Sequence, residues 1–336
     1  DIGGYVKADL IYDFNAIGST DSLDPTTIPT DGRPGQNTRL HARQTRLNLD
    51  FRPDRDYNDL QLFVEGDFFG EGDSFRLRHA YLRAGCLLAG QTWSTFMDES
   101  ILPGTLDFES PRSILLDRRA LLRLTQPLTD CLSVAVALED PQPSLDLDIA
   151  PAGGDVERLA PDLISRFRYE TARWHLQGAG LVRMIGFREV SGARDEAVGW
   201  GFDFTGSFRP REIDRVLFQV AFGEGYESYR QGTDGAVDAN GVIELNPVLA
   251  WVVGYEVDWT DRLSSTFVYS VAEGMTASFQ PASRAEALDY LAANLVVKPL
   301  PRLSYGIEYL YGSRTDKDSS KGEAHRLQFS VRYDLP

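Results

Sequence analysis

The chain has 336 residues, of which 42% are hydrophobic and 25% charged, and its formal net charge is −16. This acidic balance argues against nonspecific nucleic-acid binding, which needs a basic surface, so we expect no nucleic-acid partner. A mean hydropathy of −0.28 and the lack of any run of about 18 apolar residues exclude a membrane-spanning helix, but not transmembrane strands, which carry their lipid face in every second residue.

Apolar and polar residues alternate with a period of two along most of the chain, and this period predicts strands rather than helices. In 326–333, for example, Leu, Phe, Val and Tyr occupy the odd positions, and Arg, Gln, Ser and Arg the even ones. In chain order, the predicted strands are 2–14, 38–53, 58–70, 74–85, 86–94, 113–127, 131–140, 162–171, 173–187, 196–209, 213–225, 246–260, 263–273, 285–298, 302–312 and 323–335. About sixteen strands is an even number in the range of bacterial outer-membrane barrels.

The connections between these strands alternate in length, as they do in outer-membrane barrels. Short turns are expected at 53–58, 85, 126–130, 210–212, 260–262 and 299–301, and long loops at 15–37, 93–112, 140–161, 226–245 and 274–284. Only 70–73 is short where a long loop is due. The pattern predicts an all-β fold: one domain over 1–336, a transmembrane antiparallel up-and-down β-barrel of 16 strands. The alternative is a soluble β-sandwich, which seldom needs strands of about ten residues that end in aromatics.

Aromatic side chains fall near the ends of the predicted strands on the apolar parity, as expected of the girdles at the two membrane interfaces. They are Tyr12, Phe14, Trp174, Trp200, Trp251, Trp259, Tyr309 and Tyr333.

Arginine dominates the basic residues, because only four of the 34 are lysine. Eight arginines share the polar parity of their strands and are predicted to line the pore: Arg46, Arg76, Arg78, Arg119, Arg123, Arg166, Arg168 and Arg183. Exclusion from lipid alone would turn them inward, since Arg at the bilayer midplane costs about 2–4 kcal/mol. Because these arginines outnumber the inward-facing acidic residues, such as Asp9 and Asp50, we expect the pore to attract anions.

The segment 93–112 is too apolar for a solvated loop tip, because it contains Trp93, Phe96, Met97, Ile101 and other apolar residues. We expect it to fold into the barrel as a constriction loop. The acidic residues of this loop would then face the predicted pore-lining arginines. These acidic residues are Asp98, Asp107 and Glu109. The alternative is a loop that packs on the rim or on a neighbouring subunit.

Other chemistry has little support. The four histidines, His41, His79, His175 and His325, lie in strand-like runs without the neighbours of a catalytic triad, and no metal motif occurs. We therefore expect neither an enzyme nor a cofactor or metal. The acidic stretches at 146–148 and 153–155 fit a solvated loop better than a calcium site. Cys86 and Cys131 fall two strands apart, about 10 Å, which predicts unpaired thiols or a strained bridge.

One run of residues resembles a known family. The stretch 90–98, Gly-Gln-Thr-Trp-Ser-Thr-Phe-Met-Asp, is similar to the DcaP-like outer-membrane porins. Further similar stretches are 102–103 (Leu-Pro), 105–108 (Thr-Leu-Asp-Phe), 3–7 (Gly-Gly-Tyr-Val-Lys), 75–81 (Phe-Arg-Leu-Arg-His-Ala-Tyr), 125–128 (Thr-Gln-Pro-Leu) and 308–312 (Glu-Tyr-Leu-Tyr-Gly). The resemblance implies a sixteen-stranded trimeric porin that takes up small anionic compounds, notably dicarboxylic acids. The chain departs from the family in its cysteines, in its Leu-Pro ending and in having no N-terminal coiled coil.

The residues and the resemblance lead to one hypothesis: a homotrimeric channel of the bacterial outer membrane, in contact with lipid and lipopolysaccharide. It would pass small anionic solutes, mono- and dicarboxylates, through an arginine-lined pore. The alternatives are a general or phosphate-preferring porin and, from another class, a barrel enzyme or adhesin.

Overall fold

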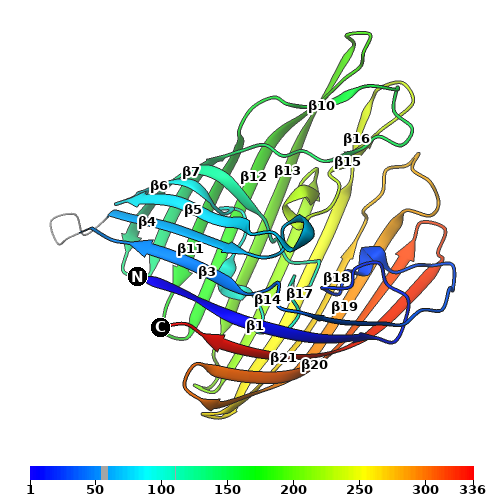
Figure 1. Cartoon of the computed structure of the whole chain (residues 1–336). Helices are drawn as coiled ribbons and strands as arrows, with labels where there is room; N and C mark the ends of the chain where they lie inside the picture. Colours follow the sequence, from blue (N-terminus) through cyan, green and yellow to red (C-terminus); the bar gives the residue numbers. More distant parts are fainter. Residues whose placement is uncertain (54–59, 110) are drawn as a thin grey trace.

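The computed structural model describes residues 1–53, 60–109 and 111–336. These residues form a closed antiparallel β-barrel (Figure 1). The described part of the wall has sixteen strands, because β2 and β3 continue one another along β1, as do β10 and β11 along β12. The barrel closes where β1 pairs with β21, for example Leu10 with Phe329. The predicted fold class is therefore confirmed.

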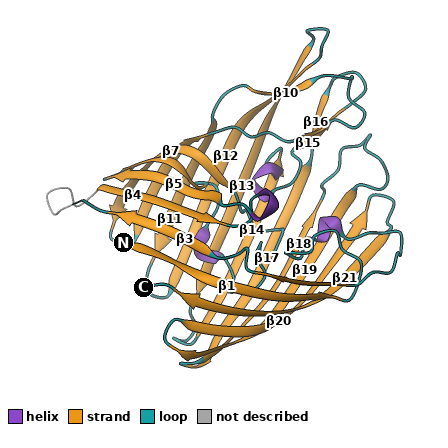
Figure 2. Cartoon of the chain, viewed as in Figure 1, coloured by secondary structure: helices purple, strands orange, loops and turns teal. Residues whose placement is uncertain are grey.

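The wall strands are β1 (Ile2–Asp13), β2 (Asn37–His41), β3 (Arg46–Phe51), β4 (Leu60–Asp67), β5 (Arg76–Ala84), β6 (Leu87–Trp93), β7 (Arg118–Thr129), β8 (Leu132–Glu139), β10 (Asp155–Arg158), β11 (Asp162–Glu170), β12 (Trp174–Arg188), β13 (Arg194–Phe208), β14 (Asp214–Glu224), β17 (Pro247–Thr260), β18 (Leu263–Glu273), β19 (Ala285–Leu300), β20 (Leu303–Asp316) and β21 (Lys321–Asp334). A small separate sheet joins β9 (Leu145–Asp146), β15 (Gly235–Val237) and β16 (Ile243–Leu245). Short 3-10 turns lie in the connections (Figure 2): η1 (Pro25–Thr27), η3 (Glu71–Asp73), η4 (Glu99–Ile101) and η5 (Glu227–Arg230). Among the described residues, no helix is long and apolar enough to cross a membrane.

The observed strands follow the predicted ranges, with three differences. The range 38–53 is broken at 42–45 into β2 and β3, and β10 precedes the range 162–171 as an extra piece of wall. The strand predicted at 113–127 begins only at Arg118, because 113–117 still belong to the preceding loop. The turn expected at 53–58, and the start of the strand expected at 58–70, fall on residues 54–59, outside the described residues.

The two faces of the wall alternate as predicted. On β7, Leu122 and Leu124 are each 56% exposed, whereas Leu121 between the outward positions is buried. Most of the expected girdle aromatics are exposed on the outer face: Phe14, Trp174, Trp200, Trp259, Tyr309 and Tyr333, with Tyr12 and Trp251 half-buried.

One predicted side-chain direction is wrong. A strict period of two along 74–85 predicts that Tyr81 faces outward with Leu77. The register shifts between Glu65 and Gly66, however, so that Glu65 pairs with His79 and Gly66 with Leu77. A one-residue shift turns the following side chains to the other face. Tyr81 therefore lies inward, with its ring 5.4 Å from that of Phe63.

The short turns and both chain ends lie at the same end of the barrel (Figure 1). The turn between β5 and β6 requires Gly85, whose φ is +57°, a left-handed conformation that glycine adopts without strain. Cys86 in this turn and Cys131 in the turn after β7 are both free thiols, which agrees with the first of the two predicted possibilities.

Candidate functional site

The connection between β6 and β7 folds into the barrel, as predicted for 93–112. Its residues Phe96, Met97 and Ile101 are at most 2% exposed. Strands on the far wall bind its backbone. The Gln177 amide donates to Met97 O (3.1 Å), Asn294 Nδ2 donates to Gly104 O (2.8 Å), and Gly104 N donates to Glu256 Oε1 (2.8 Å). Because these partners lie on β12, β19 and β17, the loop crosses the lumen.

Asp98 fixes the first half of this loop to β11, β12 and β13. Its carboxylate lies 3.2 Å from Arg168 Nη2 and 2.7 Å from His175 Nε2, and it accepts a hydrogen bond from Thr205 Oγ1 at 2.6 Å. Burial alone would raise the pKa of Asp98, but the hydrogen bonds from His175 and Thr205 and the charge of Arg168 lower it to about 2. Asp98 therefore contacts Arg168, one of the predicted arginines, and acts as a buried anchor of the loop.

Asp107 fixes the second half, and here the prediction is corrected. Its carboxylate accepts hydrogen bonds from Leu23 N and Tyr290 Oη, both at 3.1 Å, and it is 3% exposed. Next to it, Leu106 N donates to Glu308 Oε1 at 3.0 Å. Desolvation by burial raises the pKa of Asp107. Asp107 therefore holds the loop against β19 and the first long loop instead of facing the arginines.

Two further loops, which the sequence predicts only as long connections at 15–37 and 226–245, also fold inward. Tyr226 and Tyr229, in the loop after β14, are fully buried, with ring centroids 6.2 and 5.5 Å from that of Phe96. Arg112 joins the three loops, because it pairs with Asp24 of the first long loop and donates to Gln231 Oε1 at 3.0 Å. The large side chains within these loops, such as the two tyrosines, are the sequence feature that could have indicated the inward fold.

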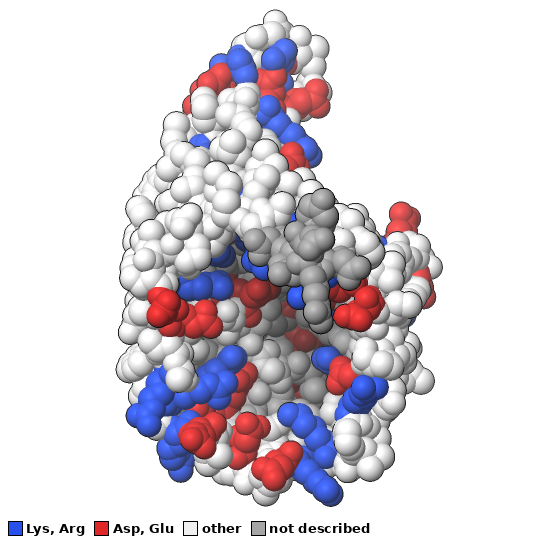
Figure 3. All heavy atoms as spheres, turned by 90° about the vertical axis from the view of Figure 1, so that its left-hand side faces the viewer, with Lys and Arg blue, Asp and Glu red and all other residues white. Residues whose placement is uncertain are grey.

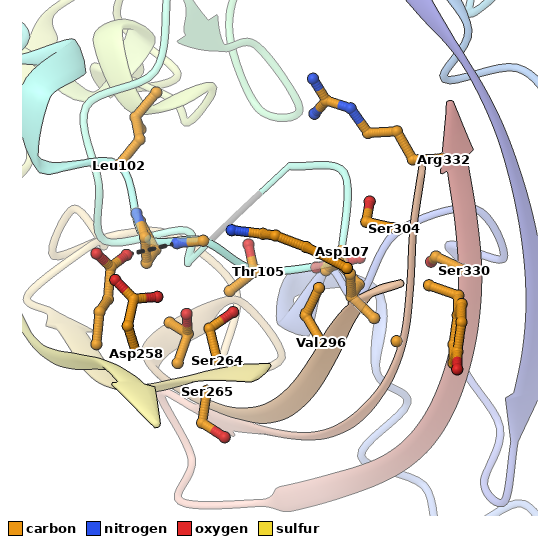
Figure 4. Close-up of a pocket in the computed structure, with 18 of the residues that line it drawn as sticks. Leu102, Thr105, Asp107, Asp258, Ser264, Ser265, Val296, Ser304, Ser330 and Arg332 are labelled. Carbon is orange, nitrogen blue, oxygen red and sulfur yellow. Dashed lines mark hydrogen bonds between the residues drawn. The ribbon is translucent and has the colours of Figure 1, made fainter. Parts of the chain in front are cut away.

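Two cavities remain in the lumen beside the constriction loop. The upper one, of about 540 Å³, lies against β3 to β7 and is lined by Arg46, Arg76, Leu77, Arg78, Gln91, Trp93, Glu99, Leu102, Phe108, Glu109, Leu116, Asp117, Arg118 and Gln231. The lower one, of about 620 Å³, is bounded by the loop segment 102–108 and by β17 to β21. Figure 4 shows the lower cavity, which is lined by Leu102 and Thr105 of the loop and by Asp258 and Ser264 of the wall, with Arg332 extending from β21. Arg46, Leu102 and Phe108 line both cavities and therefore lie between them.

The upper cavity brings three predicted arginines together. Arg76 Nη2 lies 2.9 Å from Asp67 Oδ2, and Arg78 bridges Asp67 and Glu65 at 2.7 and 3.2 Å. Arg46 lies farther from Glu65, at 3.8 Å between Nη1 and Oε1. Glu109 lines the same cavity, on its loop side.

Arg118 is a fourth arginine of this cavity, and the sequence analysis missed it. Within the described residues no carboxylate oxygen lies within 4.0 Å of its guanidinium, which instead lies over the Trp93 ring at 4.7 Å. Parity assigned the inward position to its neighbour Arg119. Arg118 lies at the boundary between the loop and the strand, where the period-two alternation no longer predicts which face a side chain occupies. This position is the sequence feature that could have indicated it.

The prediction for Arg119 and Arg183 is corrected, because these two side chains do not line the pore. Their side chains are fully buried and both contact Asp162, at 2.9 and 3.2 Å. Arg119 also pairs with Asp117, and its guanidinium carbon lies 3.6 Å from the centre of the Tyr229 ring. The inward-folded loop after β14 covers them, so their charge is neutralised beneath it.

The remaining predicted arginines lie below the loop, toward the short-turn end. Arg123 on β7 and Arg166 on β11 are half-buried, and no carboxylate lies within 4.0 Å of either among the described residues. Arg168, by contrast, is neutralised by Asp98. Seen from this end, the molecule is hollowed at its centre, and basic and acidic side chains surround the opening (Figure 3).

The described residues contain no group of three or more His, Cys, Asp or Glu side chains that could hold a metal ion. In the acidic loop after β8, Asp146 and Asp148 pair with Arg284, which lies 2.7 Å from Asp148 Oδ2.

Comparison with known proteins gives one family. A family model described as DcaP outer membrane protein matches residues 1–335. No curated protein matches the sequence.

Several solved structures share the fold. The outer membrane channel DcaP of Acinetobacter baumannii has a TM-score of 0.89 at 24% identity, covering 100% of this chain and 96% of that one. The anion-selective porin from Comamonas acidovorans has a TM-score of 0.66 at 11% identity, covering 100% and 99%. The trimer form of OmpT, an outer membrane protein of Vibrio cholerae, has a TM-score of 0.57 at 13% identity, covering 100% and 98%.

Proposed function

This chain belongs to the DcaP outer membrane protein family and is therefore a channel of the bacterial outer membrane, and from that premise we propose that it conducts small anionic solutes. The solutes are mono- and dicarboxylates, and they pass by diffusion with no chemical step. We further propose that the channel is a homotrimer. The observation that carries the anion preference is the sign of the charges along the pore.

Among the residues that line the two cavities, cationic side chains outnumber acidic ones, and in the upper cavity Arg76 and Arg78 are paired with Asp67 and Glu65 behind the lining. The upper cavity has Arg46, Arg76, Arg78 and Arg118 against Glu99, Glu109 and Asp117. The lower cavity has Lys7, Arg46, Arg209, Arg215, Lys298 and Arg332 against Asp107, Glu256 and Asp258. Arg118 is the arginine of the upper cavity whose charge has no close carboxylate in the described residues. An anion that enters would therefore find an uncompensated guanidinium before it reaches Arg46, which lies between the two cavities.

Arginine suits carboxylates because its planar fork matches their two oxygens. A carboxylate about 5 Å from one guanidinium gains roughly 3 kcal/mol at an effective dielectric near 20. This gain offsets part of the lost hydration and is small enough for release, as conduction requires. A dicarboxylate can engage two arginines of the upper cavity at once, and this favours it over a monocarboxylate.

The proposal is tested by reversal potentials in planar bilayers under a KCl gradient, followed by replacement of chloride with succinate. We expect anion selectivity and a measurable succinate current. A cation-selective channel would contradict the proposal. Stronger block of the chloride current by phosphate than by succinate would favour the phosphate-preferring alternative.

A further inference from the structure

We propose that Glu99 of the constriction loop competes with permeating carboxylates for Arg123 and Arg166, and that this competition sets how tightly the channel holds a dicarboxylate. This role rests on the proposed passage of carboxylates through the pore. The two arginines form a carboxylate site on the short-turn side of the loop, and the Glu99 side chain can enter this site when no solute is bound.

Arg123 and Arg166 form a pair of guanidinium groups on the inner face of the wall. They lie on either side of β8, because Arg123 is in register with Ala137 and Arg166 with Ala135. Only the methyl groups of these two inward alanines stand between the arginines on that strand. No carboxylate oxygen lies within 4.0 Å of either arginine among the described residues. The two positive charges repel each other, so an anion shared between them is favourable.

The backbone around Glu99 is fixed close to this pair. The preceding residue, Asp98, is the buried anchor that contacts Arg168, and Arg168 follows Arg166 by two residues on the same inward face of β11. The next residue, Ser100, donates its N–H to Asp98 Oδ1 at 3.0 Å. The loop therefore holds the Cα atom of Glu99 in place while its side chain can turn.

The side chain of Glu99 is free. It is exposed and lines the upper cavity, and in the described part of the chain no Lys, Arg or His nitrogen lies within 4.0 Å of its carboxylate. Its charge acts on both Arg123 and Arg166. Glu139 also acts on Arg123 and Asp98 on Arg166, but these two carboxylates are 1% and 2% exposed. Glu99 is therefore the one of these three carboxylates that can approach the arginine pair from the pore.

A carboxylate tethered beside a site competes for it at an effective concentration of the order of millimolar. Exposed side chains change rotamer within picoseconds to nanoseconds, so Glu99 is present whenever a solute arrives or leaves. A solute at the arginine pair has to exclude Glu99, and Glu99 promotes the release of that solute. Conduction needs binding that is weak enough for the solute to leave. A dicarboxylate brings two charges toward Glu99, so the competition weakens its binding more than that of a monocarboxylate.

The test measures succinate binding to the full chain in planar bilayers, as the succinate concentration that halves the chloride current. In Glu99→Gln we expect this concentration to fall about three- to tenfold, with longer blocked intervals and a smaller change for acetate. Glu99→Asp keeps the charge but shortens the side chain by one methylene. We expect a fall of at least about twofold there, because the carboxylate no longer reaches the arginine pair.

Two further variants serve as controls. Glu71→Gln is matched to Glu99→Gln, because Glu71 is exposed and begins η3 as Glu99 begins η4, but it lines neither cavity. It should leave succinate binding unchanged. Adding Arg123→Ser to Glu99→Gln should remove the gain in succinate binding, since the two residues act on one site.

Unchanged or weaker succinate binding in a Glu99→Gln channel that still conducts chloride would overturn the inference. A gain in Glu99→Gln with none in Glu99→Asp would do the same, because Glu99 would then act by its charge at a distance. A gain that persists after Arg123→Ser would place the effect at another site. A cation-selective unchanged channel would refute the passage of carboxylates and this role together, whereas any of these results in an anion-selective channel refutes this role alone.

Discussion

At the scale of single residues, the charge of an arginine matters for transport only if no carboxylate neutralises it. Arg118 and Arg119 are neighbours in the sequence but have opposite surroundings. Arg118 lies over Trp93 and lines the upper cavity, whereas Arg119 is buried against Asp117 and Asp162. The two therefore differ in what their replacement does.

Replacing Arg118 with Ser removes an uncompensated charge from the pore. One unit charge about 5 Å from a permeant ion changes its energy by roughly 3 kcal/mol before screening, and salt reduces this. We expect the anion-to-cation permeability ratio to fall about two- to threefold, as read from reversal potentials, with the barrel still folded. An unchanged ratio would mean that other arginines carry the selectivity.

Replacing Arg119 with Ser serves as the contrast, because it removes a partner from buried Asp162. Leaving a buried charge without any partner costs about 3–5 kcal/mol, and the cost here is smaller because Arg183 and Tyr229 still contact Asp162. We expect a lower midpoint of denaturant unfolding, followed by tryptophan fluorescence, and a permeability ratio that stays near that of the unchanged protein. A changed ratio with unchanged stability would contradict the buried position of Arg119.

At the scale of elements, the pore is shaped by loops more than by the wall. The loop between β6 and β7 crosses the lumen, and the first long loop and the loop after β14 pack on it through Arg112 and Phe96. Each half of the crossing loop has a buried carboxylate as anchor, Asp98 in the first and Asp107 in the second. The position of the loop between the two cavities therefore depends on these contacts.

Replacing Asp98 with Asn should loosen the first half of the loop at neutral pH. The lost hydrogen bonds to a charged group are worth about 1.5–3 kcal/mol each, so we expect larger open-channel noise and a higher single-channel conductance. The matched control is Asp31→Asn, since Asp31 is exposed and pairs with Arg33 alone among its described neighbours. Equal effects of the two variants would remove Asp98 as an anchor.

The anchor at Asp98 also predicts a dependence on pH. Its pKa in the folded protein is about 2, below the ordinary value of 3.8, so the carboxylate stabilises the folded loop fully above about pH 4. This contribution is lost as the pH falls through about 2. Because Asp98 stays ionised between pH 7 and pH 4, we expect no change in single-channel noise from this residue over that range. We expect the noise to rise as the pH falls toward 2. In Asp98→Asn the noise should be high throughout.

At the scale of the whole molecule, a net charge of −16 is compatible with an anion channel because the two signs are distributed differently. The pore-lining cations exceed the acids in both cavities, while exposed loops carry acids such as Asp31 and Asp148. A permeant ion interacts mainly with the charges within a few ångströms of it, because salt screens the charges farther away.

Anion selectivity should therefore weaken as salt increases. The screening length is about 10 Å at 0.1 M and about 3 Å at 1 M. At a constant ratio of the two salt concentrations, we expect the reversal potential to move toward zero between these conditions. A reversal potential independent of salt would indicate selection by pore size instead of by charge.

The barrel, its topology and the faces of most strands could be predicted from the residue pattern alone. Successive side chains of a strand point to opposite faces of the wall. Because one face contacts lipid and the other contacts water, apolar and polar residues alternate along the strand. It also indicated the inward loop, because a run that includes Phe96, Met97 and Ile101 is too apolar for solvent. The period-two alternation predicts the wrong face for Tyr81. A register shift between the paired strands turns its side chain inward, and the residue types alone do not indicate this shift.

Which arginines remain available to a solute could not be predicted in this way and follows from the three-dimensional packing. That choice depends on contacts between segments far apart in the chain, such as Asp162 beside Arg119 and Arg183, or Trp93 beneath Arg118. Two further loops cover part of the wall, and no local pattern states which side chains they bury. Charge neutralisation is a property of pairs in space, so the sequence could place the arginines on the inner face but could not say which of them the pore would expose.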